Sequence, residues 1–269
     1  MPWLFPILAY LVGSIPFGVL IARSRGVDIR QHGSGNVGAT NVFRGIGKSL
    51  GIFCLLLDFL KGFLPVVLAT NLLRVTGETP AVPLPFLWDF TGELPADRQL
   101  YVHSIQVLTA LAAIMGHNYS IFLRGKGGKG IATSAGVLMA LMPLILLGTF
   151  LVFSATFYFS GYVSLGSIAA ALSIPILRHL ADHLHHIDGD KSQPSLWEAG
   201  TWNKPLMVFA LIAAALAVWR HRSNIQRILA GTEDRLSSRT QKTSRTGRNP
   251  GWPVSSYQAG CREVAISNR

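Results

Sequence analysis

The sequence predicts an all-α, polytopic integral membrane protein with about seven transmembrane helices. Hydrophobic residues make up 49% of the chain and charged residues only 14%, whereas soluble domains usually carry about 25% charged residues. The charge-poor segments are apolar runs close to the ~20 residues that cross a bilayer as a helix. The loops between these runs alternate in net charge along the chain.

The expected spans have loose ends, and the run from Ile131 to Leu177 is the hardest to divide. Pro143 and the Gly161–Tyr162 pair are the expected breaks within it. Five spans with re-entrant segments is the alternative. The first apolar run has neither a preceding basic residue nor a cleavage site, so we expect a retained span rather than a signal peptide. The seven spans are 4–22, 50–73, 100–116, 131–142, 144–160, 163–177 and 204–219.

The distribution of loop charge predicts one orientation. Segments 23–49, 117–130 and 220–269 carry an excess of Lys and Arg, whereas loops 74–99 and 178–203 are net acidic. The positive-inside rule then places the N-terminus outside and the C-terminus in the cytoplasm.

The chain is expected to divide into a single transmembrane domain, residues 1–236, and a basic cytoplasmic tail, residues 237–269. The tail is rich in Ser, Thr, Arg and Gly and has little to bury, so disorder is expected there. The two cysteines lie in an apolar run and in this tail, which argues against a disulfide framework. No folded basic surface accompanies the tail, which argues against nucleic-acid binding.

A glycine-rich loop after the first span predicts an anion cradle. Its small residues leave the backbone adaptable and supply hydroxyl and amide donors, and Arg44 can grip a phosphate in bidentate fashion. The Gly-x-Gly-x-x-Gly spacing within it is not a dinucleotide fingerprint, because a membrane helix precedes it rather than a strand. The candidate binding residues here are Gly33, Ser34, Gly35, Asn36, Thr40, Asn41 and Arg44.

The loop from Gly125 to Gly130 predicts a second cradle on the same side of the membrane. Its glycines are expected to leave backbone N–H groups uncovered, and Lys129 adds an ammonium charge. The loop lacks the Ser or Thr of a Walker A motif, so ATP binding is not expected. The candidates are Gly127, Gly128, Lys129 and Gly130.

Further polar residues lie at span ends on the same side, and one charged pair lies inside a span. Asp58 and Lys61 are three residues apart, so they share a helix face and are expected to form a structural ion pair. His117 and Ser164 are further binding candidates. The catalytic candidates are Ser34, Arg44, His221 and Asn224.

Taken in order, these motifs resemble the bacterial acyl-phosphate-dependent glycerol-3-phosphate acyltransferases, the PlsY family. The resemblance covers about residues 4–236. The matching segments are Ser34–Arg44, Leu57–Gly62, Gly116–Asn118, Gly127–Thr133 and Arg220–Arg227.

The resemblance implies an enzyme of the bacterial inner membrane with a cytoplasmic active site. The implied reaction moves a fatty acyl group from acyl phosphate to the sn-1 hydroxyl of glycerol 3-phosphate. Ser34, Thr40, Asn41 and Arg44 would then hold phosphate with Lys129, while His221 and Asn224 complete the glycerol phosphate site. The lipid bilayer and the two substrates are the expected partners, without a cofactor, a metal or an obligate protein partner.

Two other classes of function remain open at this point. A transporter of phosphate esters would share the basic loops and the intramembrane charge pair, but it is expected to show paired repeats or helices interrupted from both faces. A lipid-binding scaffold would leave the two glycine loops unexplained.

Overall fold

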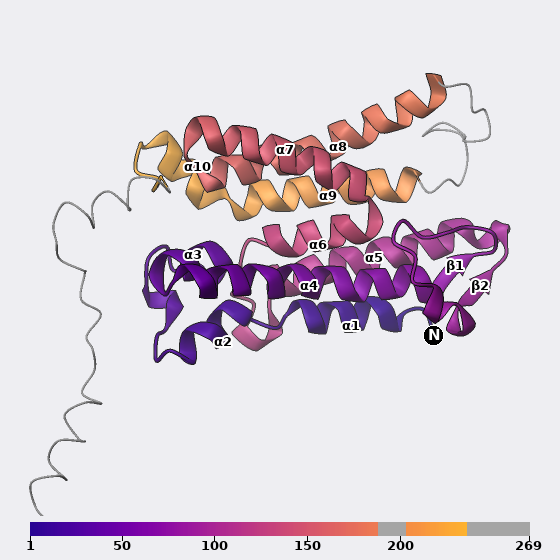
Figure 1. The fold of residues 1–269 in the computed structure, drawn as a ribbon, viewed down its shortest axis with the longest axis horizontal. Helices are drawn as coiled ribbons and strands as arrows, with labels where there is room; N and C mark the ends of the chain where they lie inside the picture. Colours follow the sequence, from indigo (N-terminus) through magenta and orange to yellow (C-terminus); the bar gives the residue numbers. More distant parts are fainter. Residues whose placement is uncertain (188–202, 236–269) are drawn as a thin grey trace, which may run out of the picture.

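The computed structural model describes residues 1–187 and 203–235, which form a mostly helical bundle (Figure 1). Helices α1, α4, α5 and α6 form one layer, and α7, α8 and α9 form the other. The helices are α1 (Leu4–Gly13), α2 (Phe17–Arg23), α3 (Ala39–Gly45), α4 (Lys48–Leu72), α5 (Gln99–Asn118), α6 (Ile131–Leu141), α7 (Pro143–Ser160), α8 (Val163–Ile187), α9 (Asn203–Arg220) and α10 (Arg222–Leu229). Short 3-10 helices are η1 (Ile29–Gln31), η2 (Pro85–Phe90), η3 (Ala96–Arg98) and η4 (Ile121–Leu123).

Each of the seven predicted spans coincides with helix, but not every helix is long enough to cross a bilayer. Five described helical segments meet the length and hydropathy of a span, and the pair α9–α10, bent by 55°, brings the number to six. Helix α6 has 11 residues, or about 16 Å of rise, which is about half of the hydrocarbon core. The apolar helices therefore support a multi-pass membrane protein with five or six candidate spans.

The first span, predicted as one helix, is broken into α1 and α2. The break lies at Ser14–Pro16, where proline interrupts the hydrogen-bond ladder. Carbonyl groups freed inside a membrane must find other donors. The Lys61 ammonium donates to the Ile15 carbonyl oxygen at 2.8 Å, and the Ser120 hydroxyl donates to the Ser14 carbonyl oxygen at 2.5 Å. The break is thus supported by α4 and by the segment that follows α5.

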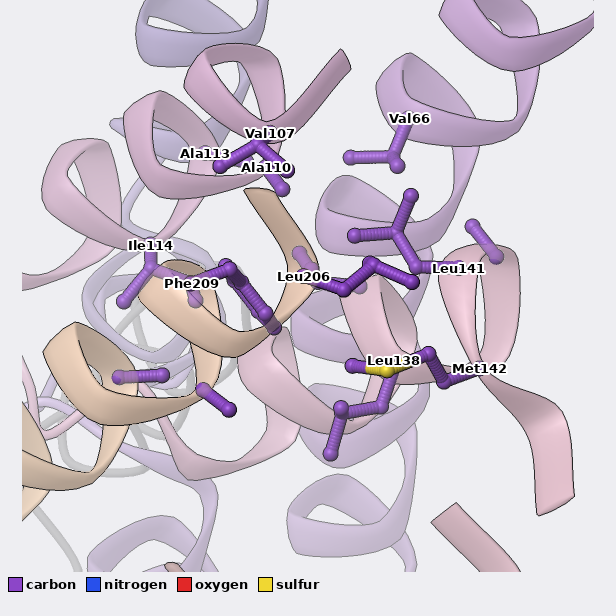
Figure 2. Close-up of a cluster of buried hydrophobic side chains, with 14 of the residues drawn as sticks. Val66, Val107, Ala110, Ala113, Ile114, Leu138, Leu141, Met142, Leu206 and Phe209 are labelled. Atoms are coloured by element: carbon purple, nitrogen blue, oxygen red, sulfur yellow. The ribbon is translucent and has the colours of Figure 1, made fainter. Parts of the chain in front are cut away.

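The hydrophobic core lies where α4, α5, α6 and α9 meet (Figure 2). Phe209 of α9 is fully buried there, among Ile114 of α5 and Leu138 of α6. Glycine allows α4 and α6 to approach closely, because a Cβ at Gly62 would overlap the Thr133 carbonyl group. This packing holds the start of α6 against the middle of α4.

Three segments expected to be loops contain regular structure. The loop 74–99 contains a parallel pair, β1 (Leu73–Val75) with β2 (Gly92–Leu94), which the all-α prediction omitted. Helix α3 forms within the first glycine loop because Val42 buries its side chain beside α2. Helix α8 continues through Ile187 into segment 178–203, since no glycine or proline stops it there.

The two ends of the bundle differ in what they hold. Figure 1 places the N-terminus and the strands at one end and α2, α3 and α10 at the other. Both glycine loops and His221 consequently share an end. The predicted tail 237–269 and the domain boundary at 236 lie outside the described residues.

Candidate active site

A cavity of about 530 Å³ opens at the end of the bundle where α3 and α10 lie. Its walls come from segments far apart in the chain, from the first glycine loop to the turn after α10. Most of the predicted site residues line it: Gly33, Ser34, Asn36, Thr40, Asn41, Arg44, Asp58, His117, Lys129, Gly130, Ser164, His221 and Asn224. Four predicted residues lie outside the lining: Gly35, Lys61, Gly127 and Gly128.

Asp58 on the cavity wall forms a buried ion pair with Lys61, which lies behind the wall. Lys61 Nζ lies 2.8 Å from Asp58 Oδ1, and each side chain is only 3% exposed. His117 at the end of α5 places Nδ1 3.7 Å from the same carboxylate oxygen. Because Lys61 already compensates Asp58, the carboxylate on the cavity wall offers little net repulsion to an entering anion.

Asn41 organises the first glycine loop from inside. Its Oδ1 accepts the Ser34 backbone N–H at 3.2 Å, and its Nδ2 donates to the His32 and Asn36 carbonyl oxygens, each at 2.9 Å. Gly33 has a φ of +58°, and a Cβ there would overlap Asn41 Oδ1. The amide of Asn41 is therefore engaged in shaping the wall that carries Ser34.

The expectation of uncovered N–H groups at residues 125–128 is wrong. Gly125, Gly127 and Gly128 donate to carbonyl oxygens of Ser120, Asn118 and His117 at 2.9, 3.2 and 3.0 Å. The last carbonyl groups of α5 have no partner within the helix and need donors from elsewhere. The sequence-based prediction did not take this need into account. The loop thus folds back onto α5 and keeps Gly127 and Gly128 away from the cavity.

Arg220 binds the carbonyl groups of the same loop. Its guanidinium donates to the Gly128 carbonyl oxygen at 2.8 and 3.0 Å and to the Gly127 carbonyl oxygen at 2.9 Å. The guanidinium also lies over the Tyr119 ring, 5.2 Å from its centroid. Arg220 therefore joins the end of α9 to the loop, a role that its place in a basic cluster did not reveal.

The backbone donors of the second cradle lie at the start of α6. The first intrahelical bond runs from the Ser134 N–H to the Gly130 carbonyl oxygen at 2.7 Å, so the N–H groups of the preceding turn have no helical acceptor. Gly130, Ile131 and Ala132 line the cavity. A helix N-terminus of this kind favours an anion.

Lys129 is a half-buried cation on the cavity wall. Burial, together with the positive charges of Arg227, Arg44 and Arg220, lowers the pKa of Lys129 to about 8, although Glu233 acts in the opposite direction. A bound anion would stabilise the ammonium form and restore the pKa toward its usual value.

Glu233 is the site residue that the sequence prediction missed. Its carboxylate accepts from the Ser164 hydroxyl at 2.6 Å, from Asn224 Nδ2 at 2.7 Å and from Arg227 Nε at 2.7 Å. Burial raises its pKa, but these donors outweigh burial and keep the pKa below its usual value. Gly231, with a φ of +68°, turns the chain back after α10 and brings Glu233 there.

The contact with Glu233 fixes the orientation of Asn224. A carboxylate only accepts, so the Nδ2 end of the amide faces Glu233. The Oδ1 end is buried without a donor among the residues that the structure describes. Buried polar groups without partners are uncommon, and this one lies at the cavity wall.

His221 sits at the bend between α9 and α10 and is 2% exposed. Its Nδ1 lies 2.7 Å from the Ala217 carbonyl oxygen, which requires the proton on Nδ1 and leaves Nε2 as an acceptor. Burial and the charge of Lys129 lower the pKa of His221 to about 4. The ring is therefore neutral near pH 7.

The cavity combines anion-binding groups with apolar wall. Arg44, Lys129 and Arg227 supply positive charge, whereas Leu55 and Phe153 contribute hydrocarbon surface from α4 and α7. The fold and the site together define a polytopic membrane protein with a cavity at one end of its bundle whose lining is suited to a phosphate-bearing or carboxylate-bearing molecule.

A family model described as glycerol-3-phosphate acyltransferase matches residues 3–231. The chain belongs to this family, which confirms the resemblance seen in the motifs. It is therefore a membrane-bound acyltransferase, and the family assignment does not support the transporter alternative.

Curated relatives and solved structures agree with this assignment. The glycerol-3-phosphate acyltransferase of Geotalea daltonii is 40% identical over 227 residues, covering 84% of this chain and 93% of the relative. That of Aquifex aeolicus is 37% identical over 230 residues, covering 86% and 96%.

PlsY, an integral membrane glycerol 3-phosphate acyltransferase, has a similar solved structure. Its glycerol 3-phosphate form matches with a TM-score of 0.66 and 35% identity, covering 88% of this chain and 96% of that one. Its lysophosphatidic acid form matches with a TM-score of 0.63 and 35% identity, covering 87% and 94%.

The pKa of Lys129 predicts a pH-dependent affinity for anions. Below about pH 8 the ammonium is charged, and above it the unliganded protein loses this charge. Sulfate, a dianion at both pH values, should therefore raise the melting temperature less at about pH 9.5 than at about pH 7. Lys129→Arg keeps its charge, so sulfate should raise its melting temperature by nearly the same amount at both pH values. Equal sulfate stabilisation of the parent protein at the two pH values would contradict this role of Lys129.

Proposed function

We propose that this protein transfers a fatty acyl group from acyl phosphate to the sn-1 hydroxyl of glycerol 3-phosphate. The products are 1-acyl-glycerol 3-phosphate (lysophosphatidic acid) and inorganic phosphate, in the first step of phospholipid synthesis. The observation that carries the proposal is the meeting of Arg44, Lys129 and a neutral His221 in one cavity. Membership of the glycerol-3-phosphate acyltransferase family supports the acyl transfer and the acceptor.

We further propose seven membrane crossings, with the N-terminus outside and the cavity on the cytoplasmic side of the bacterial inner membrane. The basic segments 23–49 and 117–130 contribute residues to the cavity, and the acidic loop 74–99 lies at the opposite end of the bundle. The positive-inside rule assigns the basic end to the cytoplasm. Helix α6 would be the short crossing, completed by the loop before it.

The cavity can hold both anionic substrates if their polar parts share the cationic wall. Arg44 and Lys129 would bind phosphate oxygens together with the N–H groups at the start of α6. Apolar side chains from α4 and α7, Leu55 and Phe153, would lie along the acyl chain. Two phosphate-bearing reactants account for the number of anion-binding groups.

The reaction needs alignment more than covalent catalysis. An acyl phosphate is a mixed anhydride and is already activated, so an enzyme nucleophile is not required. The hydroxyl oxygen of glycerol 3-phosphate attacks the acyl carbon, forming the ester bond as the bond between that carbon and the phosphate oxygen breaks. Inorganic phosphate leaves. Positive charge from Arg44 and Lys129 offsets the negative charge that develops.

The proton of the attacking glycerol 3-phosphate hydroxyl has two candidate acceptors. His221 Nε2 is one, because Nδ1 is committed to the Ala217 carbonyl oxygen. The leaving phosphate of the donor is the other. A second anion in the cavity would raise the pKa of His221 from about 4, which makes the ring a stronger base in the substrate complex.

A donor assay tests the proposed reaction. Purified protein given palmitoyl phosphate and glycerol 3-phosphate should release lysophosphatidic acid and phosphate in equal amounts, whereas palmitoyl coenzyme A should yield neither. Arg44→Gln should lower kcat/KM by roughly 10²-fold, and Arg222→Gln, at an exposed cation outside the cavity, should not. Flux of glycerol 3-phosphate into vesicles without ester formation would point to the transporter instead.

The role of His221 predicts a change in the pH–rate profile. If Nε2 takes the hydroxyl proton, kcat falls on the acid side as the ring becomes protonated in the substrate complex. His221→Gln should then lower kcat by roughly 10²- to 10⁴-fold and abolish that acid limb. An unchanged rate and profile would remove His221 from proton transfer and leave the donor phosphate as the acceptor.

A further inference from the structure

A second cavity, of about 610 Å³, lies beside α2 and shares no lining residue with the catalytic cavity. Its walls come from α2, η1 and the segment between α5 and α6. One part of the lining is apolar and includes Val19, Leu20 and Phe122. The other part is cationic and consists of Arg23, Arg30, Arg124 and Lys126.

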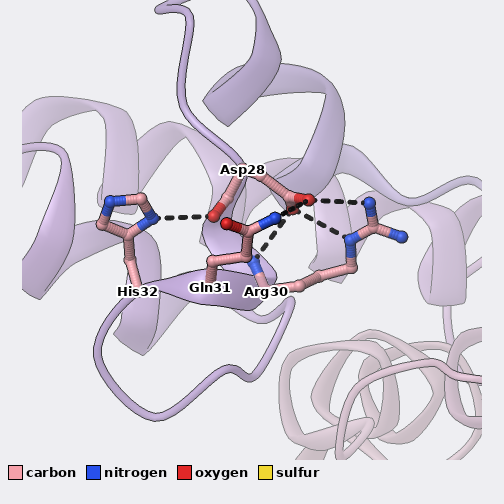
Figure 3. A network of polar contacts seen from close by, with 4 residues as sticks. All are labelled: Asp28, Arg30, Gln31 and His32. Atoms are coloured by element: carbon pink, nitrogen blue, oxygen red, sulfur yellow. Dashed lines mark hydrogen bonds and ion pairs between the residues drawn. The ribbon is translucent and has the colours of Figure 1, made fainter.

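Only one of these four cations has a carboxylate partner among residues 1–187 and 203–235. Arg30 donates to both oxygens of Asp28, at 2.9 and 2.8 Å, and Figure 3 shows the two side chains facing each other. The side-chain hydrogen bond from Arg30 helps hold the pKa of Asp28 at about 2, so this pair stays ionised. Arg124 and Lys126 have no ion-pair partner in the described part of the chain, and Arg23 acts on Asp28 without forming an ion pair with it. The hollow therefore has an excess of positive charge, which favours a bound anion.

The cavity lies at the end of a candidate span, where lipid headgroups are expected. Arg23 is the last residue of the first candidate span, Leu4–Arg23. Leu20 and Phe122 on its wall are 49% and 59% exposed, as expected for side chains that contact lipid. Positive side chains at the end of a span, next to an apolar surface, match the two parts of a phospholipid.

The glycine loop separates the two cavities. Lys126 faces the second cavity, and Lys129, three residues later, faces the catalytic one. Arg124 begins this loop with a φ of +52°, a left-handed conformation that is uncommon outside glycine. That backbone turn, together with the contacts of Gly127 and Gly128 to α5, directs the two lysines to different places.

We propose that the second cavity binds an anionic phospholipid of the surrounding bilayer. The lipid phosphate would contact Arg23, Arg124 and Lys126, and an acyl chain would lie against Leu20 and Phe122. The apolar half of the wall selects a lipid phosphate over free phosphate, because free phosphate would leave that hydrocarbon surface exposed to water. This binding is separate from the acyl transfer.

Native mass spectrometry of the delipidated protein with added phosphatidylglycerol tests the proposal. The variant Arg23→Gln/Arg124→Asn removes two charges, and asparagine tolerates the left-handed backbone at 124. Phosphatidylglycerol binding should weaken about fivefold for each charge removed. Lys126→Gln, which leaves residues 23 and 124 intact, should weaken it in the same direction.

The matched control is Arg25→Gln/Arg222→Gln, which loses the same charge at exposed positions outside both cavities. It should bind phosphatidylglycerol as the parent does, and all variants should bind phosphatidylcholine equally weakly. Equal loss in the control, or parental binding by both cavity variants, would overturn the proposal. Displacement of the lipid by millimolar inorganic phosphate would also overturn it, since the site would then be one for free phosphate.

Discussion

The geometry of the proposed catalytic cavity depends on the buried ion pair between Asp58 and Lys61. Besides its 2.8 Å contact with Asp58, Lys61 donates to the Ile15 carbonyl oxygen at the break between α1 and α2. Asp58 in turn faces His117 at the end of α5. An ionised side chain within a span is costly unless it is paired. The Asp58–Lys61 pair, through its contacts with Ile15 and His117, therefore connects the first span, α4 and α5 beside the site.

Two further charged contacts close the cavity from the C-terminal side. Arg220 holds the carbonyl groups of Gly127 and Gly128, and Glu233 gathers Ser164, Asn224 and Arg227. Arg220 joins the end of α9 to the loop before α6, and Glu233 joins the start of α8 to α10. The groups proposed to act on the substrates thus lie on a frame of paired polar side chains, which suits catalysis by alignment and charge.

Hydropathy and loop charge predicted the helical segments well, because the membrane admits few alternatives to helix. The same reasoning missed the break at Pro16, which is stabilised by the distant Lys61. At the site, the residue types alone identified Arg44, Lys129 and His221 as candidates, and all three line the cavity. It misjudged Gly127 and Gly128, whose N–H groups serve the end of α5, and it overlooked Glu233. Both cases depend on tertiary contacts that residue types and spacing do not encode.

We infer that cations from distant segments of the chain act on one bound anion. Calorimetry of glycerol 3-phosphate binding to the purified protein tests it most directly, with Arg44→Gln, Lys129→Gln and their double variant, and Arg222→Gln as control. Each cavity variant should weaken binding by about tenfold or more. The double variant should depart from additivity, and the control should match the parent. Strictly additive losses, or binding that neither single variant changes, would contradict a shared site.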